Sequence, residues 1–382
     1  MKIAMLDPSL FTGRYDDSLC AALARAGHEV ALHGRPMRAT DAIAPEGYRY
    51  LPSFFPLSER LRGLIGYGAA FRAAKAAEYL AAASIGSTAF LREADVLHVQ
   101  WLPFPPADAR LLARLGSGVC RPALVHTVHN ASAFHGDSGA QARGYRALLD
   151  RFDALIVHGE TTREALLKQG IAAERLHVVP HPPMTLAPAG AEDMAAVPTA
   201  ARPRILFFGT IRPYKGFDLL IGACLALWRE GLDFELAVAG KPFMDIAPLL
   251  DHVRTQGFGD RLVTELGFLT EPRLDAHLRK ADIIAFPYRD IDSSGAFLSA
   301  LHYGKAMIAS RVGMFTALPE DAALLCPPED EGALSQALRG LLVDPARRAR
   351  FGARAAAMAN AMGTWDDAAR ATLSVYERVR DA

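Results

Sequence analysis

Short apolar segments of strand type alternate with amphipathic segments of helical type along the whole chain. Such alternation is typical of parallel sheets whose strands are joined by crossover helices, and it leaves few other folds open. The expected strands of the first half are residues 2–6, 29–33, 95–100, 122–129, 152–158 and 176–180, with the first helix at 16–25. The expected strands of the second half are residues 204–209, 234–240, 262–266, 283–287 and 306–310.

A break in this pattern divides the chain into two domains. Residues 182–203 are rich in Pro and Ala and show little periodicity, so we interpret them as a linker. A chain of 382 residues is also too long for one ordinary core. We therefore expect an α/β fold of two Rossmann-like, doubly wound domains that face a cleft. They take residues 1–185 and 203–364, and residues 365–382 return to the first domain as a C-terminal helix.

The composition excludes several classes of partner. Lys+Arg and Asp+Glu both total 42, so no global field draws the chain to nucleic acid. No apolar stretch is long enough to span a bilayer, which predicts a cytoplasmic protein that lies on a membrane at most. The cysteines stand singly, without the close pairs of metal or redox sites, and favour reduced, mostly buried thiols: Cys20, Cys120, Cys224 and Cys326.

Two cations follow the strand that ends at Gly209. Arg212 and Lys215 occupy a short turn before the next helix, at the end of a strand where open α/β sheets bind ligands. Paired cations there suit a diphosphate. The plain alternative is a solvated turn with two charges.

A second candidate anion site lies in the same domain. Ser293, Ser294 and Gly295 begin an expected helix at 296–303, and the free N–H groups and dipole of a helix start attract anions. Ordinary Ser capping is the alternative. Because this helix also follows a strand, we expect it to share one diphosphate with the two cations.

In the first domain, His129 ends a strand and is expected to donate to a sugar hydroxyl or to steady charge on a leaving group. A satisfied core histidine is the alternative, and it is preferred for His126, His135, His158 and His181. Glu160 is the best acidic candidate if the chemistry needs a base. The loop that ends at Gly13 lacks the G-x-G-x-x-G pattern, which disfavours a nicotinamide dehydrogenase, although Gly13 allows close approach to a donor or acceptor.

The segment from Phe54 to Leu80 mixes apolar residues with cations. A basic amphipathic helix of this kind can lie on an anionic membrane, which would suit a lipid-linked acceptor. A plain surface helix with a solvated basic face is the alternative. The cations are Arg60, Arg62, Arg72 and Lys75.

Taken together, these motifs resemble a GT-B fold glycosyltransferase, most like the family 4 group that builds bacterial polysaccharides and glycolipids. The resemblance covers nearly the whole length of the chain. It is carried by Gly27-His-Glu-Val30, Thr127-Val-His-Asn130, Val178-Val-Pro-His-Pro182, Phe208-Gly-Thr-Ile-Arg-Pro-Tyr-Lys-Gly216, Ser294-Gly295, Gly304-Lys-Ala-Met-Ile-Ala-Ser310, Val312-Gly313 and Thr364-Trp-Asp-Asp-Ala-Ala.

The resemblance implies that the C-terminal domain binds a nucleotide sugar and the N-terminal domain binds the acceptor. Arg212 and Lys215 would then contact the donor diphosphate, His129 would approach the transferred sugar, and Phe268 would lie beside the base. The full expected donor set is Gly209, Arg212, Lys215, Phe268, Tyr288, Asp292, Ser293, Ser294, Gly295 and Ser299.

The chain departs from the family at one pattern. Many members carry two glutamates separated by seven residues, the first near the transferred sugar and the second gripping the ribose. Aligned on Gly304, these positions hold Ile291 and Ser299, with Asp290 and Asp292 beside the first. An aspartate would then substitute for the first glutamate.

We therefore expect a metal-independent hexosyltransferase without a cofactor, which moves a sugar from a UDP- or GDP-linked donor to a saccharide or lipid-linked saccharide in polysaccharide or cell-surface glycan synthesis. Retention of configuration is favoured, whereas inversion would need a base such as Glu160 or Asp17. A nucleotide-sugar epimerase and a non-catalytic nucleotide-sugar-binding protein are the alternatives. Peripheral contact with the inner face of the plasma membrane is expected, and no nucleic acid.

Overall fold

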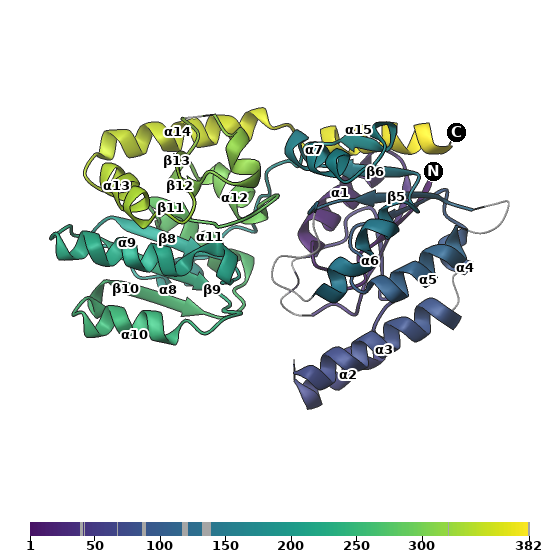
Figure 1. The fold of residues 1–382 in the computed structure, drawn as a ribbon, viewed down its shortest axis with the longest axis horizontal. Helices are drawn as coiled ribbons and strands as arrows, with labels where there is room; N and C mark the ends of the chain where they lie inside the picture. The colour runs from purple at the N-terminus through teal and green to yellow at the C-terminus, as the bar shows by residue number, and fades with distance from the viewer. Residues whose placement is uncertain are drawn as a thin grey trace. The chain divides into compact units, whose positions relative to one another are not determined.

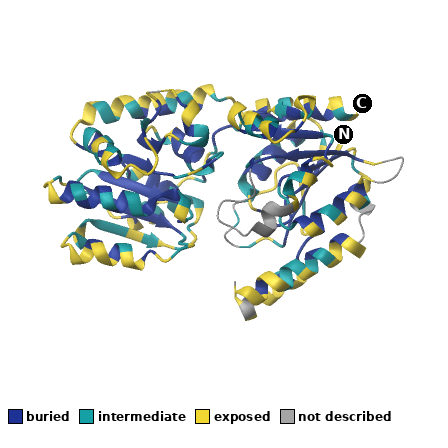
Figure 2. Cartoon of the chain, in the orientation of Figure 1, coloured by how far each residue is buried: buried dark blue, intermediate teal, exposed yellow. Residues whose placement is uncertain are grey.

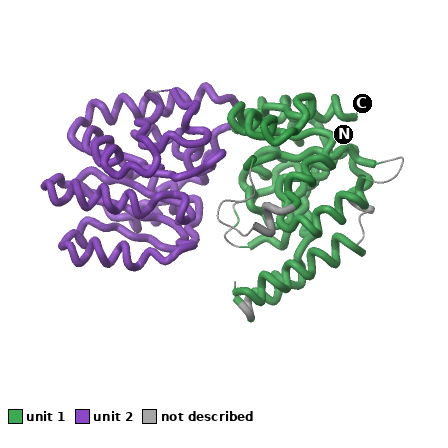
Figure 3. Tube along the Cα trace, viewed as in Figure 1, with its two compact units in different colours: residues 1–181, 364–382 green, residues 182–363 purple. Residues whose placement is uncertain are grey.

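The chain forms two compact units, residues 1–181 with 364–382 and residues 182–363 (Figure 3). A computed structural model describes residues 1–38, 41, 43–66, 68–85, 89–116, 121–131, 139–319 and 321–380. Each unit is built on one parallel sheet flanked by helices (Figure 1). Among the described residues, no helix is both long enough and apolar enough to cross a membrane.

Unit 1 contains a seven-stranded sheet in the order β3-β2-β1-β4-β5-β6-β7. Its strands are β1 (Lys2–Leu6), β2 (Glu29–His33), β3 (Arg49–Leu51), β4 (Val96–Val99), β5 (Ala123–Thr127), β6 (Ala154–Val157) and β7 (Leu176–Val178). Its helices are α1 (Gly13–Arg25), α2 (Pro56–Ile65), α3 (Ala69–Ile85), α4 (Ala89–Arg92), α5 (Pro105–Leu115), α6 (Gly139–Leu149), α7 (Glu160–Lys168) and α15 (Trp365–Arg380).

Unit 2 contains a six-stranded sheet in the order β10-β9-β8-β11-β12-β13. Its strands are β8 (Arg204–Phe208), β9 (Glu235–Gly240), β10 (Leu262–Leu266), β11 (Ile283–Phe286), β12 (Ala306–Ser310) and β13 (Leu324–Cys326). Its helices are α8 (Ala191–Ala196), α9 (Phe217–Arg229), α10 (Ala247–Thr255), α11 (Glu271–Lys280), α12 (Gly295–Ala300), α13 (Glu331–Leu342) and α14 (Pro345–Ala361).

Both faces of each sheet are covered, which explains why the central strands are mostly apolar. In β8, Ile205 and Phe207 enter one core cluster, whereas Leu206 and Phe208 enter the cluster on the opposite face. Successive side chains of a strand point to opposite faces, so a strand buried on both sides has no polar face. Figure 2 shows the resulting buried sheets beneath exposed helix surfaces.

The strand order reverses once in each sheet, and this reversal positions the ligand sites of such folds. The chain builds outward from β1 to β3 and then returns to β4, and in unit 2 it builds outward from β8 to β10 and returns to β11. Loops that follow the two strands at the reversal lead in opposite directions and leave room for a ligand at their carboxyl ends. In unit 2 these are the loops after β8 and β11.

The interpretation of residues 182–203 as a linker is wrong, because this segment packs as part of unit 2. The backbone N–H groups of Ala187 and Ala189 donate to carboxylates on α11, those of Glu271 and Asp275. Lys280 on the same helix donates to backbone carbonyls of the segment. Hydrogen bonds with side chains of α11 hold the segment in place. Such contacts leave no periodic pattern in the segment's own sequence, so they could not be predicted from it.

Helix α15 packs in unit 1 against α1, β5 and β6, as expected for a returning C-terminal helix. Its buried face includes Ala368, Thr372 and Tyr376. Three cysteines, Cys20, Cys224 and Cys326, are free and buried, in agreement with the expectation of reduced thiols. Cys120 and His135 lie outside the described residues.

Candidate functional site

Lys215 lies in the loop after β8, and its ammonium group is close to the end of that strand. Gly209 directly follows this strand and has a φ of +90°, and its N–H donates to the carbonyl of Ala239. A Cβ on Gly209 would stand 3.5 Å from Nζ of Lys215. The absence of a side chain at Gly209 therefore leaves the space around the ammonium group open, and the positive φ favours glycine there.

The loop that carries Arg212 and Lys215 is fixed against the loop after β11. Gly216 has a φ of 65°, and a Cβ on it would stand 1.9 Å from the carbonyl oxygen of Pro287. The N–H of Arg289 donates to the carbonyl of Tyr214 at 2.7 Å, and its guanidinium forms an ion pair with Asp218 at 2.6 Å. The loops after β8 and β11 are thus held against each other by hydrogen bonds and an ion pair.

Lys215 is a buried cation, with 7% of its surface exposed. No carboxylate of the described residues lies within ion-pair distance of its Nζ, which faces the ring of Tyr288 at 5.2 Å from the centroid. Burial lowers the pKa of Lys215, and the nearby positive charge of Arg212 lowers it further. A buried ammonium without a carboxylate is costly, and an anionic ligand would relieve that cost.

Ser294 is joined to this site through Tyr288. Burial raises the pKa of Tyr288, and a hydrogen bond with Ser294 opposes that shift. Ser294 also caps α12, because its hydroxyl oxygen accepts from the N–H of Phe297 at 3.2 Å. Lys215 and Ser294 are therefore both neighbours of Tyr288, although the Ser294 side chain already serves as an ordinary helix cap.

The remaining predicted residues of this region have defined contacts. The hydroxyl of Ser299 is buried and donates to the carbonyl of Gly295 at 2.8 Å, within α12. A Cβ on Gly295 would stand 3.1 Å from the methyl group of Met184. The half-buried Asp292 is held through its backbone, since its carbonyl accepts from the N–H of Met314 at 3.1 Å. Ser293 adjoins it and is also half-buried.

Two exposed aromatic rings lie near Arg212. Phe268 follows β10, and its ring meets that of Phe243 edge-on, with centroids 6.2 Å apart. The guanidinium of Arg212 lies 4.5 Å from the centroid of Phe243. Phe243, three residues after β9, was not predicted from the sequence. An exposed aromatic close to a strand end, in Gly240-Lys-Pro-Phe243, is the signal that would have identified it.

In unit 1, the predicted His129 belongs to a cluster of aromatic rings at the carboxyl ends of β5, β6 and β7. Its ring centroid lies 5.2 Å from that of His158, which lies 5.0 Å from that of His181. Trp101 stacks on His129 with an interplanar angle of 10°. Tyr15 of α1 contacts all three histidines.

Hydrogen-bonding groups surround both ring nitrogens of His129. His158 Nδ1–H donates to the carbonyl of Val179 at 3.1 Å, and its Nε2 lies 3.3 Å from Nδ1 of His129. Burial lowers the pKa of His158 to about 4 and that of His129 well below its usual value, so both rings are neutral. The Nε2 of His129 lies 3.0 Å from the amide oxygen Oε1 of Gln100, which can only accept, so Nε2–H of His129 donates to it.

Both ring nitrogens of His129 therefore have protein partners. A direct hydrogen bond from His129 to a sugar requires one of these bonds to open. His129 therefore lies at the end of its strand, as the catalytic prediction requires, but its ring is also hydrogen-bonded within the protein, as expected for a core histidine.

The other predicted residues of unit 1 contact residues outside this cluster. Glu160 begins α7, is exposed and pairs with Arg163 at 3.4 Å. Asp17 accepts a 2.5 Å hydrogen bond from the hydroxyl of Tyr48, and burial raises its pKa. Gly13 begins α1, and a Cβ on it would stand 3.0 Å from the side chain of Ile43.

A buried carboxyl pair at the end of β1 was missed from the sequence. Asp7 and Asp16 are fully buried, and burial raises the pKa of both. Thr12 donates its N–H to Asp7 at 2.9 Å. Asp7 Oδ1 and Asp16 Oδ2 have no hydrogen-bond partner among the described residues, and the charge of Asp7 adds to burial in raising the pKa of Asp16.

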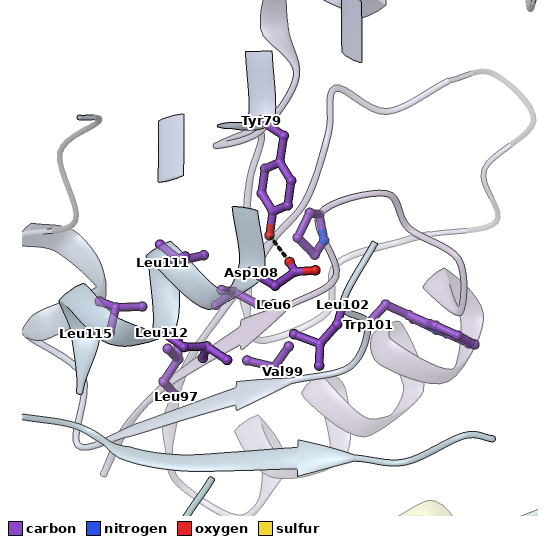
Figure 4. A pocket seen from close by; sticks show the side chains of 11 residues that line it. Leu6, Tyr79, Leu97, Val99, Trp101, Leu102, Asp108, Leu111, Leu112 and Leu115 are labelled. Carbon is purple, nitrogen blue, oxygen red and sulfur yellow. Dashed lines mark hydrogen bonds between the residues drawn. The ribbon is translucent and has the colours of Figure 1, made fainter. Parts of the chain in front are cut away.

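A narrow apolar cavity lies between the sheet of unit 1 and helices α3 and α5 (Figure 4). Its one charged wall residue is Asp108, which accepts from the hydroxyl of Tyr79 at 2.7 Å and from the N–H of Phe104 at 2.8 Å. Burial raises the pKa of Asp108 to about 8. Its two oxygens are satisfied internally, so the cavity presents no free polar group to a ligand. In the described parts of the chain, no group of three His, Cys, Asp or Glu side chains is placed to hold a metal.

Comparison with known proteins is consistent with this geometry. Residues 12–182 match the family described as Glycosyltransferase Family 4, and residues 202–344 match Glycosyl transferases group 1. The D-inositol 3-phosphate glycosyltransferase of Kineococcus radiotolerans is 31% identical over 290 residues, which cover 67% of this chain and 66% of that protein. The match therefore spans just under two thirds of that relative's length.

Two further proteins show the range of relatives. The GDP-mannose:glycolipid 4-beta-D-mannosyltransferase of Xanthomonas campestris pv. campestris is 26% identical over 283 residues, covering 69% of this chain and 75% of that protein. The structure of Anabaena Alr3699/HepE in complex with UDP and glucose superposes with a TM-score of 0.71 at 16% identity, covering 99% of this chain and 100% of that one. This second likeness establishes the fold alone.

Proposed function

The chain belongs to the GT-B glycosyltransferases of the family 4 type, and from this premise we propose that it transfers a sugar from a nucleotide diphosphate donor to a hydroxyl of a saccharide or lipid-linked saccharide. Unit 2 would bind the donor and unit 1 the acceptor. The observation that carries the proposal is Lys215, a buried cation without a carboxylate at the end of β8.

The chemical task is to stabilise negative charge that develops on the departing diphosphate. Lys215 and Arg212 supply positive charge from the loop after β8, and Ser294 adds a polar group from the loop after β11. Fixed charges in a site of low dielectric act more strongly than in water and need little reorganisation. This arrangement supports transfer without a metal or another cofactor.

The exposed pair Phe243 and Phe268 would receive the base of the nucleotide. Their rings lie beside Arg212, on the side of the loop that faces the ends of β9 and β10. Aromatic faces bind any nucleobase by stacking. The named relatives use GDP-mannose in one case, and one structure holds UDP, so both bases remain in the proposal.

We propose retention of configuration. Inversion needs a base beside the acceptor hydroxyl. Glu160 is exposed and paired with Arg163, and Asp17 is held by Tyr48, so neither stands ready as that base. The anomeric configuration of the product, read by NMR, would decide the question, and an inverted product would exclude retention.

The first prediction concerns Lys215. Lys215→Met should keep the fold and lower kcat/KM for donor by at least about a hundredfold, because one preorganised charge contact in such a site contributes roughly 3 kcal/mol. Initial rates with a range of donors and acceptors would measure this.

The matched control is Lys305→Met in the same unit. Lys305 is also partly buried, and its ammonium donates to the carbonyl of Arg279, away from the loops after β8 and β11. An unchanged kcat/KM of Lys215→Met for donor would contradict the proposal, whichever acceptor is supplied.

The second candidate is a nucleotide-sugar-binding protein without turnover. It is favoured by Ile291, which is buried, and by Ser299, whose hydroxyl is bonded within α12, at positions where the family often carries glutamates. Such a protein would show a rise in melting temperature with UDP, GDP or their sugars, yet release no free nucleotide. An epimerase would instead convert the donor with no acceptor present.

A further inference from the structure

Gln100 is a fully buried glutamine that directly follows β4. Its backbone N–H donates to the carbonyl of Leu6 at 2.7 Å, which ties it to the end of β1. Glutamine is seldom buried, and a buried amide needs partners for both its oxygen and its NH₂ group. The contacts of these two groups therefore show what the side chain does in the fold.

The two ends of the Gln100 amide face different groups. The NH₂ group donates to Sδ of Met5 at 2.9 Å and lies 3.4 Å from Nε2 of His98. The oxygen Oε1 lies 3.0 Å from Nε2 of His129. Because a thioether sulfur only accepts, the contact with Met5 directs the NH₂ group away from His129 and leaves the oxygen facing it.

His98, beside the NH₂ group of Gln100, is itself fixed at both ring nitrogens. Its Nδ1 lies 2.6 Å from the hydroxyl of Tyr376 on α15, and its Nε2 lies 2.7 Å from the hydroxyl of Thr127. All four side chains are buried. A buried polar network whose members all have partners is rigid, so the Gln100 amide is held in one orientation.

This orientation determines which nitrogen of His129 carries the hydrogen. His129 donates to the amide oxygen through Nε2–H, so its Nδ1 carries a lone pair in the neutral ring. His158 donates through Nδ1–H to the carbonyl of Val179, so its Nε2 also carries a lone pair, 3.3 Å from Nδ1 of His129. Lone pairs that face each other repel. The Nε2–H form of His129 therefore depends on Gln100.

We propose that Gln100 is a positioning residue for the sugar transfer proposed above, on which this inference rests. Its amide oxygen keeps the hydrogen of His129 on Nε2 and fixes the ring, on which Trp101 stacks. Of the two contacts of His129, the one with His158 is the weaker, so this contact opens and Nδ1 accepts a hydrogen bond from a sugar hydroxyl. Gln100 is fully buried and acts through His129, not by contact with a substrate.

The first measurement is nitrogen NMR of the full chain with isotope-labelled histidine, because the shifts of the two ring nitrogens distinguish the Nε2–H from the Nδ1–H form. The parent should show His129 in the Nε2–H form, and His129→Gln identifies its signals. Gln100→Met removes the acceptor oxygen at similar side-chain length. The hydrogen should then move to Nδ1, where His158 accepts it.

Gln100→Glu keeps an acceptor oxygen, so the Nε2–H form of His129 should persist. The added carboxylate should raise the pKa of His129, which burial and the neighbouring histidines lower. The titratable groups near His129 are Tyr15, His98, His126, His158 and His181.

Initial rates then connect the hydrogen position with turnover. Gln100→Met should lower kcat/KM for donor by about tenfold, since His129 loses the acceptor that a sugar hydroxyl needs. Gln100→Glu should retain more of the parent value. Gln169→Met is the matched control, because it removes an amide of unit 1 that donates to the carbonyl of Ala131. It should leave both the hydrogen of His129 and kcat/KM as in the parent.

An Nδ1–H form of His129 in the parent would overturn the proposal, and this measurement needs no variant to fold. So would an unchanged kcat/KM in folded Gln100→Met when the parent is active. A parent without turnover for any donor and acceptor would instead contradict the proposed function, and with it any need for a positioned His129.

Discussion

Asp7 and Asp16 make the stability of the folded chain depend on pH. Burial raises the pKa of both carboxyls, so the folded chain holds a proton that the unfolded chain releases near pH 4. The folded state binds more protons than the unfolded state between the unfolded and the folded pKa values. Its stability is therefore greatest below the unfolded pKa and falls as the pH rises towards the folded pKa.

Asp16→Asn should weaken this dependence, because the amide occupies the same buried position without a titrating proton and removes a charge beside Asp7. We expect the variant to gain stability over the parent, with a larger gain at pH 8 than at pH 5, by up to about 1.4 kcal/mol per pH unit. Urea unfolding of unit 1 at the two pH values would measure the difference. An identical gain at both values would contradict a raised pKa of Asp16 in the folded chain.

The sequence predicted some site residues because their position depends on one strand and one turn. Arg212 and Lys215 follow an apolar strand directly, so their placement at its carboxyl end needed no tertiary information. The pairing of Asp7 with Asp16 depends on how α1 turns back over β1. The occupation of both nitrogens of His129 depends on Gln100 and His158, which come from other strands.

The turn at Gly216 is an element whose shape determines where Lys215 lies. Gly216→Ala should place a methyl group against the carbonyl of Pro287 and separate the loops after β8 and β11. We expect a loss of stability clearly above that of Gly231→Ala, together with weaker donor binding. Gly231 also has a positive φ, but a Cβ added there would meet nothing within 4 Å, so it reports the backbone cost alone, about 1 kcal/mol.

Thermal unfolding and titration with UDP and GDP would compare the two glycine variants. If Gly216→Ala and Gly231→Ala lose the same stability and bind nucleotide alike, the clamp between the two loops has no role.

The strands predicted correctly from the sequence were those long enough to give a recognisable run of apolar residues. The strands β1, β2, β10 and β12 have the predicted bounds. The short strands β3 (Arg49–Leu51) and β13 (Leu324–Cys326) were missed, because three residues are too few for a pattern. The equally short β7 (Leu176–Val178) was predicted because Val179 extends its apolar run. The segment before β8 was misread because its packing comes from side chains of α11.

At the scale of the whole molecule, α15 belongs to unit 1 although the chain of unit 2 separates it from the rest of that unit. Trp365 at its start contacts the rings of Tyr15 and His181, with centroids 5.2 and 5.6 Å apart. Trp365→Ala should lower the stability of unit 1 by about 2 kcal/mol, less than for a fully buried tryptophan. Unit 2 should unfold as in the parent.

Hydrogen exchange resolved by residue would separate the two units. Faster exchange in α1, β5 and β6 with unchanged exchange in β8 and β11 is the expected result. A uniform increase across both units would mean that the Trp365 contacts do not act within unit 1.

The discontinuity of unit 1 has a consequence for the order in which the protein acquires its structure on the ribosome. Residues 182–363 form one continuous stretch and can fold as soon as they emerge. Unit 1, which begins with the first residues, keeps the site for α15 uncovered until residues 365–380 have followed the whole of unit 2. The half of the molecule that is made first is therefore the half that is finished last.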